Sequence, residues 1–112
     1  MSFKIEKVNS LLVQEVSNIL NKSMRLSGLG FVTVTYAECA KDLRSARIWV
    51  SIFENKEKNL KILMDNKYQI QKELNKRIHM KFVPRIHFRL DKSQDHYDRI
   101  EKLLKKEEKK LE

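Results

Sequence analysis

The side chains best suited to binding chemistry in this sequence are positively charged and lie close together between positions 67 and 89. The only acidic residue in this stretch is Glu73. A generic solvated surface mixes both signs of charge, whereas a cluster of one sign is typical of a surface that contacts nucleic-acid phosphates. The basic residues of the cluster are Lys67, Lys72, Lys76, Arg77, Lys81, Arg85 and Arg89.

Residues that could support catalysis or hold a metal are few and scattered. The histidines His79, His87 and His96 have no metal-ligand spacing with Cys39 or with a pair of carboxylates. We expect His87 to face outward from a strand and Cys39 to be a small packed hydrophobic residue. Asp42 has no recognisable nucleophile or base beside it, which favours a carboxylate that caps a turn. The sequence therefore predicts no catalytic residue, no metal and no enzymatic activity.

A short glycine motif, Gly28-Leu29-Gly30, is the only feature that resembles a phosphate-binding loop. Such loops follow a strand and open a helix, whereas this motif follows a predicted helix and precedes a predicted strand. We therefore expect no nucleotide and no other cofactor.

Length and composition restrict the class of protein. The chain has 112 residues, enough for one domain, and a formal net charge of +9. No apolar run approaches the roughly 18 residues of a membrane span, and the start, MSFKIEK, lacks the apolar centre of a signal peptide. One cysteine cannot form an internal disulfide. We expect a monomeric cytoplasmic protein with no membrane partner and no small-molecule substrate.

The spacing of apolar residues predicts the elements that position the basic cluster. Three- and four-residue steps predict a helix over residues 4–25, and alternation predicts strands over 31–38, 46–53 and 85–90. Helical spacing returns over residues 60–78, with an expected break at the polar stretch 65–67. A last helix begins near residue 97. The order is α-β-β-α-α-β plus a tail, which we divide into a domain at 1–95 and a charged helical tail at 96–112.

The same spacing of apolar residues predicts which side chains share a face of each helix or strand. In the first strand we expect Val32, Val34 and Tyr36 on one face. Ile70, Leu74 and Ile78 define a buried helix stripe, so that Lys72 and Lys76 share another face, as do Arg77 and Lys81 if the helix reaches that far. In the third strand Arg85, His87 and Arg89 point away from Ile86, Phe88 and Leu90.

Two aromatic residues of the second strand have competing interpretations. Trp49 and Phe53 could stack on unpaired bases. Aromatic residues are also common packing residues in strands, and we favour ordinary sheet packing for both.

Three segments resemble the bacterial ribosome-binding factor A family. Residues 41–51 read KDLRSARIWVS and are similar to its D-L-x-x-A-x-V-x-V-S segment. Residues 72–88 read KELNKRIHMKFVPRIHF and are similar to its R-E-L-G-K-R-L-R-L-R-x-V-P-E-L-x-F segment. Asp91-Lys92-Ser93, with Arg99-Ile100 and Leu103-Leu104, follows its D-x-S … R-I-x-x-L-L ending. The resemblance spans the chain from the first helix to Leu104.

The resemblance implies a type II KH fold, an α+β domain with a kinked helix pair. The family kinks its helices at an Ala-x-Gly motif, where this chain has Asn66, Lys67 and Tyr68. Asn75 replaces a glycine of the family, and Arg85 replaces its usual glutamate. These departures make the surface more basic and leave the kink without its usual residues.

The function implied by the resemblance is binding without catalysis. Members of the family bind the small (30S) ribosomal subunit and assist late maturation of its 16S rRNA. Carried over, Lys72, Lys76, Arg77 and Lys81 would contact rRNA phosphates. The patch would be extended by Lys67, Arg85 and Arg89, with Arg44 and Arg47 as possible contributors.

Two other functions remain open on the sequence alone. One is a general single-stranded RNA-binding KH module, although the G-x-x-G loop of such modules is missing. The other is a protein-interaction domain for an acidic partner. A small nuclease is a distant third, because no metal or acid–base constellation is visible.

Overall fold

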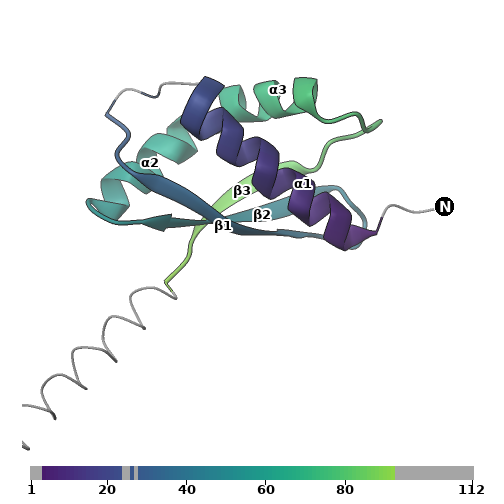
Figure 1. Ribbon diagram of the computed structural model, residues 1–112, viewed down its shortest axis with the longest axis horizontal. Coiled ribbons are helices and arrows are strands. Elements are labelled where there is room, and N and C mark those ends of the chain that lie inside the picture. Colours follow the sequence, from purple (N-terminus) through teal and green to yellow (C-terminus); the bar gives the residue numbers. More distant parts are fainter. Residues whose placement is uncertain (1–3, 24–25, 27, 93–112) are drawn as a thin grey trace, which may run out of the picture.

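The computed structural model of the chain describes residues 4–23, 26 and 28–92 (Figure 1). Their order matches the predicted α-β-β-α-α-β succession. The predicted tail, residues 96–112, and the boundary expected at residue 95 lie outside the described residues. The elements are α1 (Ile5–Asn18), a π-helical turn η1 (Ile19–Ser23), β1 (Val32–Cys39), β2 (Ser45–Ile52), α2 (Lys56–Asp65), α3 (Lys67–Arg77) and β3 (Arg85–Leu90).

The three strands form one mixed sheet in the order β1-β2-β3. β1 and β2 are antiparallel, whereas β2 and β3 are parallel. A parallel pair needs a crossover connection, and α2 and α3 supply it between β2 and β3. Figure 1 shows α1, α2 and α3 on the same side of the sheet, so that no helix of the described chain covers the other face.

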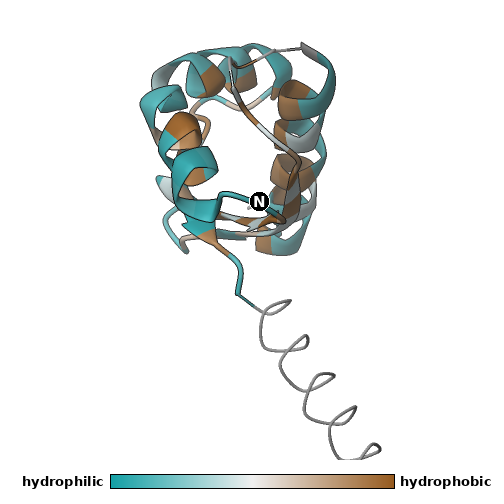
Figure 2. Cartoon of the chain, turned by 90° about the vertical axis from the view of Figure 1, so that its left-hand side faces the viewer, coloured by the Kyte–Doolittle hydropathy of each residue, from teal (hydrophilic) through white to brown (hydrophobic). Residues whose placement is uncertain are grey.

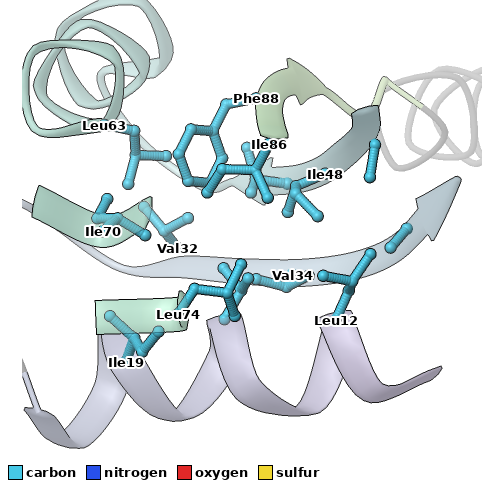
Figure 3. Packing of buried hydrophobic residues seen from close by; sticks show 14 of the residues in the cluster. Leu12, Ile19, Val32, Val34, Ile48, Leu63, Ile70, Leu74, Ile86 and Phe88 are labelled. Atoms are coloured by element: carbon cyan, nitrogen blue, oxygen red, sulfur yellow. The ribbon is translucent and has the colours of Figure 1, made fainter. Parts of the chain in front are cut away.

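The hydrophobic core lies between the inner face of the sheet and the three helices. Figure 2 shows hydrophobic segments of the helices turned toward this interior. The helical stripe of α1 and the alternating residues of β2 are buried as their spacing predicted. Figure 3 shows side chains from both layers in contact, among them Leu12, Ile48, Leu63, Leu74 and Phe88, each at most 2% exposed.

An irregularity in β1 makes one predicted face wrong. The pairing with β2 shifts between Val34 and Tyr36, which inserts Thr35 as an extra residue. The shift turns Tyr36 outward, where 45% of it is exposed, and turns Ala37 and Cys39 into the core. Strict alternation from Val32 places Tyr36 beside Val32 and Val34. The apolar phase reverses after Tyr36, where Ala37 and Cys39 alternate with Glu38, and this reversal marks the bulge.

The break between α2 and α3 is confirmed, and it falls at Asn66. The backbone of Asn66 leaves helical geometry, with φ −103° and ψ 10°. Its side-chain Nδ2 donates to the carbonyl oxygen of Ile62 at 2.7 Å, while its own carbonyl accepts from the N–H of Ile70 at 3.1 Å. Asn66 thus satisfies backbone groups of both helices at the point where the Ala-x-Gly kink residues are missing.

α3 ends before the predicted shared face of Arg77 and Lys81 can form. Arg77 is its last residue, and Ile78 is extended with φ −101° and ψ 123°. Ile78 still enters the core at 4% exposure, so the predicted buried stripe with Ile70 and Leu74 is confirmed. Lys81 lies in the connection to β3, four residues beyond the end of α3.

Candidate nucleic-acid interface

The exposed lysines of α3 form the first part of the basic surface. Lys72 and Lys76 are one turn apart and both exposed, as their spacing predicted. Neither has an ion-pair partner among residues 4–23, 26 and 28–92. Their charges are therefore available to an external anion.

Arg77 is placed differently from these lysines. Its Nη1 lies 3.5 Å from Oε2 of Glu15 on α1, and its Nε lies 3.3 Å from Oε1 of Glu73 on α3. The side chain is 28% exposed and Glu15 is 16% exposed. This half-buried pair of contacts connects α3 to α1, so Arg77 contributes to the fold.

The face of the sheet without helices carries the second part of the basic surface. We call it the open face and define it by the outward residues Tyr36, Glu38, Arg47, Trp49, Arg85, His87 and Arg89. Pairing between β2 and β3 sets Arg47 opposite His87 and Trp49 opposite Arg89. From α3, the Nζ of Lys67 lies 2.9 Å from Nδ1 of His87. The structure thus brings Arg47, Arg85 and Arg89 to one face, and Lys67 lies beside it, in contact with His87.

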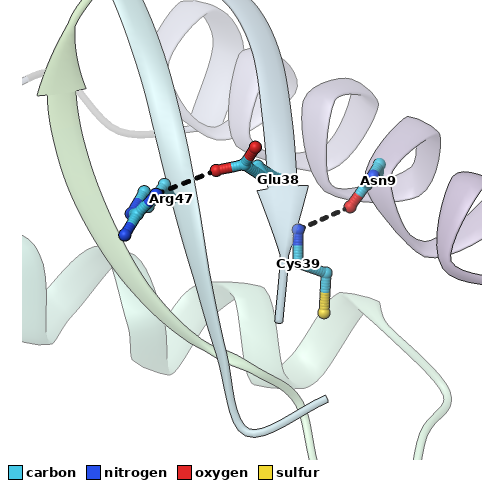
Figure 4. Close-up of polar contacts among 4 residues, drawn as sticks. All are labelled: Asn9, Glu38, Cys39 and Arg47. Carbon is cyan, nitrogen blue, oxygen red and sulfur yellow. Dashed lines mark hydrogen bonds and ion pairs between the residues drawn. The ribbon is translucent and has the colours of Figure 1, made fainter. Parts of the chain in front are cut away.

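One carboxylate within the three strands offsets charge on the open face. Glu38 of β1 pairs with Arg47 of β2, with 3.0 Å between Oε1 and Nη1 (Figure 4). Both side chains are more than half exposed, so the pair is screened by water and restrains Arg47 only weakly.

Aromatic rings lie among the charges of the open face. Tyr36 and Trp49 are directly paired across β1 and β2, and their rings stack with centroids 5.4 Å apart and an angle of 14° between planes. Trp49 is half-buried and packs against the Tyr36 ring, close to the packing role we favoured. Phe53 is 81% exposed, so the packing predicted for it is wrong, because it lies just beyond the last residue of β2.

Arg44 and Lys81 lie in a third part of the surface, where the β1–β2 turn approaches the α3–β3 connection. The β1–β2 turn and the α3–β3 connection border a pocket of about 590 Å³. The carbonyl of Arg44 accepts from the N–H of Arg85 at 2.9 Å, which joins the turn to the start of β3. The pocket is lined by Asp42, Leu43, Arg44, Met80, Lys81, Phe82 and Val83.

The titratable residues singled out in the sequence have structural explanations. Partial burial lowers the pKa of His87, and the charges of Lys67, Arg89 and Arg85 lower it further. Cys39 is buried, which confirms the expected packed residue, and burial, followed by the nearby charge of Asp42, raises the pKa of its thiol. Figure 4 shows the N–H of Cys39 donating to Oδ1 of Asn9 at 2.8 Å.

Asp42 serves a turn, as expected, and the glycine motif lies in the connection between η1 and β1. Oδ1 of Asp42 accepts from the N–H of Arg44 at 3.1 Å, a side-chain turn bond. Gly28 has a φ of +77°, which favours glycine, and the N–H of Gly30 donates to Oδ1 of Asn59 at 2.8 Å. Among the described residues no group of three or more His, Cys, Asp or Glu side chains could hold a metal.

Tyr36 is the residue of this surface that sequence reasoning missed. Alternation through the whole strand places it with Val32 and Val34, and the shift at Thr35 reverses that assignment. The available signal was the reversal of phase after Tyr36, where the apolar residues Ala37 and Cys39 alternate with Glu38. Glu38, which pairs with Arg47, was also not anticipated.

The sequence has close relatives among ribosome-binding factors. Residues 4–104 match the family model described as ribosome-binding factor A. A ribosome-binding factor A of Natranaerobius thermophilus is 40% identical over 103 residues, which cover 89% of this chain and 79% of the relative. Another, of Thermodesulfovibrio yellowstonii, is 36% identical over 104 residues, covering 91% and 88%.

Solved structures show the same fold. The crystal structure of ribosome-binding factor A from Thermus thermophilus matches with a TM-score of 0.67 at 20% identity, over 79% of this chain and 97% of that one. A homology model of the Thermus thermophilus protein, fitted into a cryo-EM map of its 30S complex, matches with a TM-score of 0.68 at 20% identity, over 80% and 97%. These likenesses confirm the α+β, KH-like fold.

Proposed function

The chain belongs to the ribosome-binding factor A family, and on that premise we propose that it binds the small (30S) ribosomal subunit. The family membership carries the proposal, and a Thermus thermophilus relative of the same fold has been fitted into a map of a 30S complex. The basic surface supports it, since Lys72 and Lys76 project from α3 without a carboxylate partner within the described chain.

The finer role is assistance in late maturation of 16S rRNA without catalysis by this chain. A binding protein shifts an equilibrium between two rRNA conformations only by its difference in affinity for them. The chain would therefore bind an immature arrangement of the subunit more tightly than the mature one. It would act as a monomer in the cytoplasm, with rRNA and the small subunit as its partners. Within the described residues no helix is long and apolar enough to cross a membrane.

The contact residues proposed for rRNA phosphates are exposed, apart from Lys67 and Arg77, which are half-buried. Lys72 and Lys76 come first, and Arg77 supports them by fixing α3 against α1. Lys81 and Arg44 lie at the loop pocket, and the remaining cations lie on or beside the open face. They are Lys67, Arg47, Arg85 and Arg89.

Co-sedimentation tests the proposal directly. The protein is sedimented with immature small subunits, mature small subunits and large subunits, at low and near-physiological salt. We expect binding restricted to small subunits, tightest for the immature ones and retained at the higher salt. Equal binding to every particle that disappears as salt rises would mean that the net charge of +9 explains the association, and the proposal would be wrong.

Reversing the charge of two lysines tests whether α3 contacts the small subunit. Lys72→Glu with Lys76→Glu is expected to abolish binding to small subunits. Lys4→Glu with Lys7→Glu, exposed positions at the start of α1, changes the net charge equally and is the matched control. Equal losses in the two variants would contradict a specific role for α3.

A further inference from the structure

The open face has a composition that phosphate binding alone does not explain. A surface that only neutralises phosphates needs cations, yet its centre is the stacked pair of Tyr36 and Trp49. Tyr36 is 45% exposed, so the outer side of the stack is accessible. The indole Nε1 of Trp49 is covered and has no hydrogen-bond acceptor among the described residues, a cost that apolar packing residues would avoid.

Cations surround this stack on the neighbouring strand positions. Arg89 is the β3 partner of Trp49, and Arg47 is two residues before Trp49 on β2. Along β3, the outward residues Arg85, His87 and Arg89 recur at about 6.6 Å, the two-residue repeat of a strand. A planar aromatic surface beside a row of cations is suited to bases on the rings and phosphates on the arginines.

We propose that the open face binds an unpaired stretch of RNA, with a base stacked on the Tyr36–Trp49 pair and the adjoining phosphates on Arg47 and Arg89. This inference rests on the proposed function, because it describes how the same protein holds part of the rRNA. The ligand is single-stranded, since the bases of a duplex are stacked on one another and offer no free face.

The alternative ligand for this face is an acidic protein segment. Such a segment would pair with the arginines but would make little use of a coplanar aromatic pair. An unpaired nucleotide uses both the aromatic pair and the arginines. It also predicts that affinity differs between bases in oligonucleotides of equal charge. Adenine, with the larger ring system, binds more tightly than uracil on this basis.

Trp49 allows a direct measurement, because it is the only tryptophan of the chain. Its fluorescence is followed while short oligoadenylate, oligouridylate, an RNA duplex of equal length or polyglutamate is added. We expect quenching that saturates with oligoadenylate, weaker affinity for oligouridylate and little change with the duplex. Equal responses to the duplex would overturn the inference, and so would stronger quenching by polyglutamate, which would indicate an acidic protein partner.

Variants of the exposed ring test its role. Tyr36→Ala is expected to weaken binding of oligoadenylate roughly five-fold to a hundred-fold, the range measured for loss of one base–aromatic stack. Tyr36→Phe keeps the ring and should keep the affinity. Tyr68→Ala is the matched control, since Tyr68 is 80% exposed on α3 and is not one of the residues that define the open face. If Tyr36→Ala fails to fold, Tyr36→Leu removes the aromatic ring and keeps an apolar side chain.

Two outcomes separate this inference from the proposed function. If the wild-type protein does not co-sediment with small subunits, the proposed function fails whatever the fluorescence shows. If small subunits bind the wild-type protein and Tyr36→Leu binds oligoadenylate as tightly as the wild type does, only the stacking inference is wrong.

Discussion

Arg77 lies in the middle of the basic cluster, yet its guanidinium faces two carboxylates. Glu15 is the more buried of the two, and it is held by Arg77 across the contact between α1 and α3. Removing the arginine leaves that carboxylate partly buried without this partner, which costs more than the loss of an exposed charge.

We therefore expect Arg77→Ala to lower the free energy of unfolding by about 1–3 kcal/mol. Lys76→Ala, one residue earlier and exposed, should change it by less than about 0.5 kcal/mol. Urea unfolding of both variants measures the difference. Equal stabilities would mean that the contacts of Arg77 contribute little, and Arg77 would then rank with Lys76 as a candidate for phosphate contact.

His87 makes the stability of the fold depend on pH. Partial burial, followed by Lys67 from α3 and by Arg89 and Arg85 from its own strand, holds its pKa in the folded protein below the ordinary 6.5. Arg47 is its strand partner on β2. The unfolded chain then binds a proton near pH 6.5 that the folded chain does not yet bind. Stability therefore rises with pH in this window.

We expect the free energy of unfolding to be highest above about pH 6.5 and to fall as the pH decreases through that value. His87→Gln keeps a polar side chain and should remove this part of the dependence. Urea unfolding at several pH values, in wild type and variant, checks the expectation. A variant with an unchanged pH profile would show that other groups produce the dependence.

At the scale of elements, two amide side chains hold segments together. Gln71 of α3 accepts from the N–H of Ile86 at 2.8 Å and donates to the carbonyl of Pro84 at 3.1 Å, which places the start of β3. Asn59 of α2 accepts from the N–H of Gly30 and donates to the carbonyl of Glu54, each at 2.8 Å. Asn59 is only 4% exposed, so both backbone groups depend on it in a place poor in water.

Asn59→Ala should lower the free energy of unfolding by about 1–3 kcal/mol, since the N–H of Gly30 and the carbonyl of Glu54 lose their partner. Gln69→Ala, an exposed amide on α3, is the control and should change stability by less than about 0.5 kcal/mol. Thermal unfolding of the two variants makes the comparison. A neutral Asn59→Ala would mean that these backbone groups reach water.

At the scale of the whole molecule, the net charge of +9 is distributed over separate surfaces. Lys72 and Lys76 of α3, the pocket beside Arg44 and Lys81, and the open face lie on different parts of the surface. One RNA could contact all three only by wrapping around the protein. Attraction by total charge and contact by particular residues differ in their response to salt, because each phosphate that is neutralised releases counterions.

The logarithm of the affinity for small subunits should fall linearly with the logarithm of salt concentration. Replacing Lys72 or Lys76 by alanine should reduce the slope by about 1 for each phosphate that is no longer neutralised. Lys7→Ala, on α1, should leave the slope unchanged. Binding to small subunits is measured over a series of salt concentrations. An equal reduction of the slope in both kinds of variant would indicate attraction by total charge.

The sequence by itself determined the order of elements, most of the core and the place of the helix break. These follow from local properties: the stripe of α1, the alternation in β2 and β3, and the polar residues around Asn66 are all visible in neighbouring residues. It also indicated a basic surface, since the scarcity of carboxylates between positions 67 and 89 is a matter of composition.

Only the tertiary structure decided which of those charges are free and what accompanies them. Glu15 reaches Arg77 from a helix far away in the chain, and Glu38 reaches Arg47 from the next strand. One extra residue in β1 turned Tyr36 onto Trp49. Such contacts depend on which side chains are paired across strands and on packing between distant segments, and the periodicity of one segment does not specify these partners.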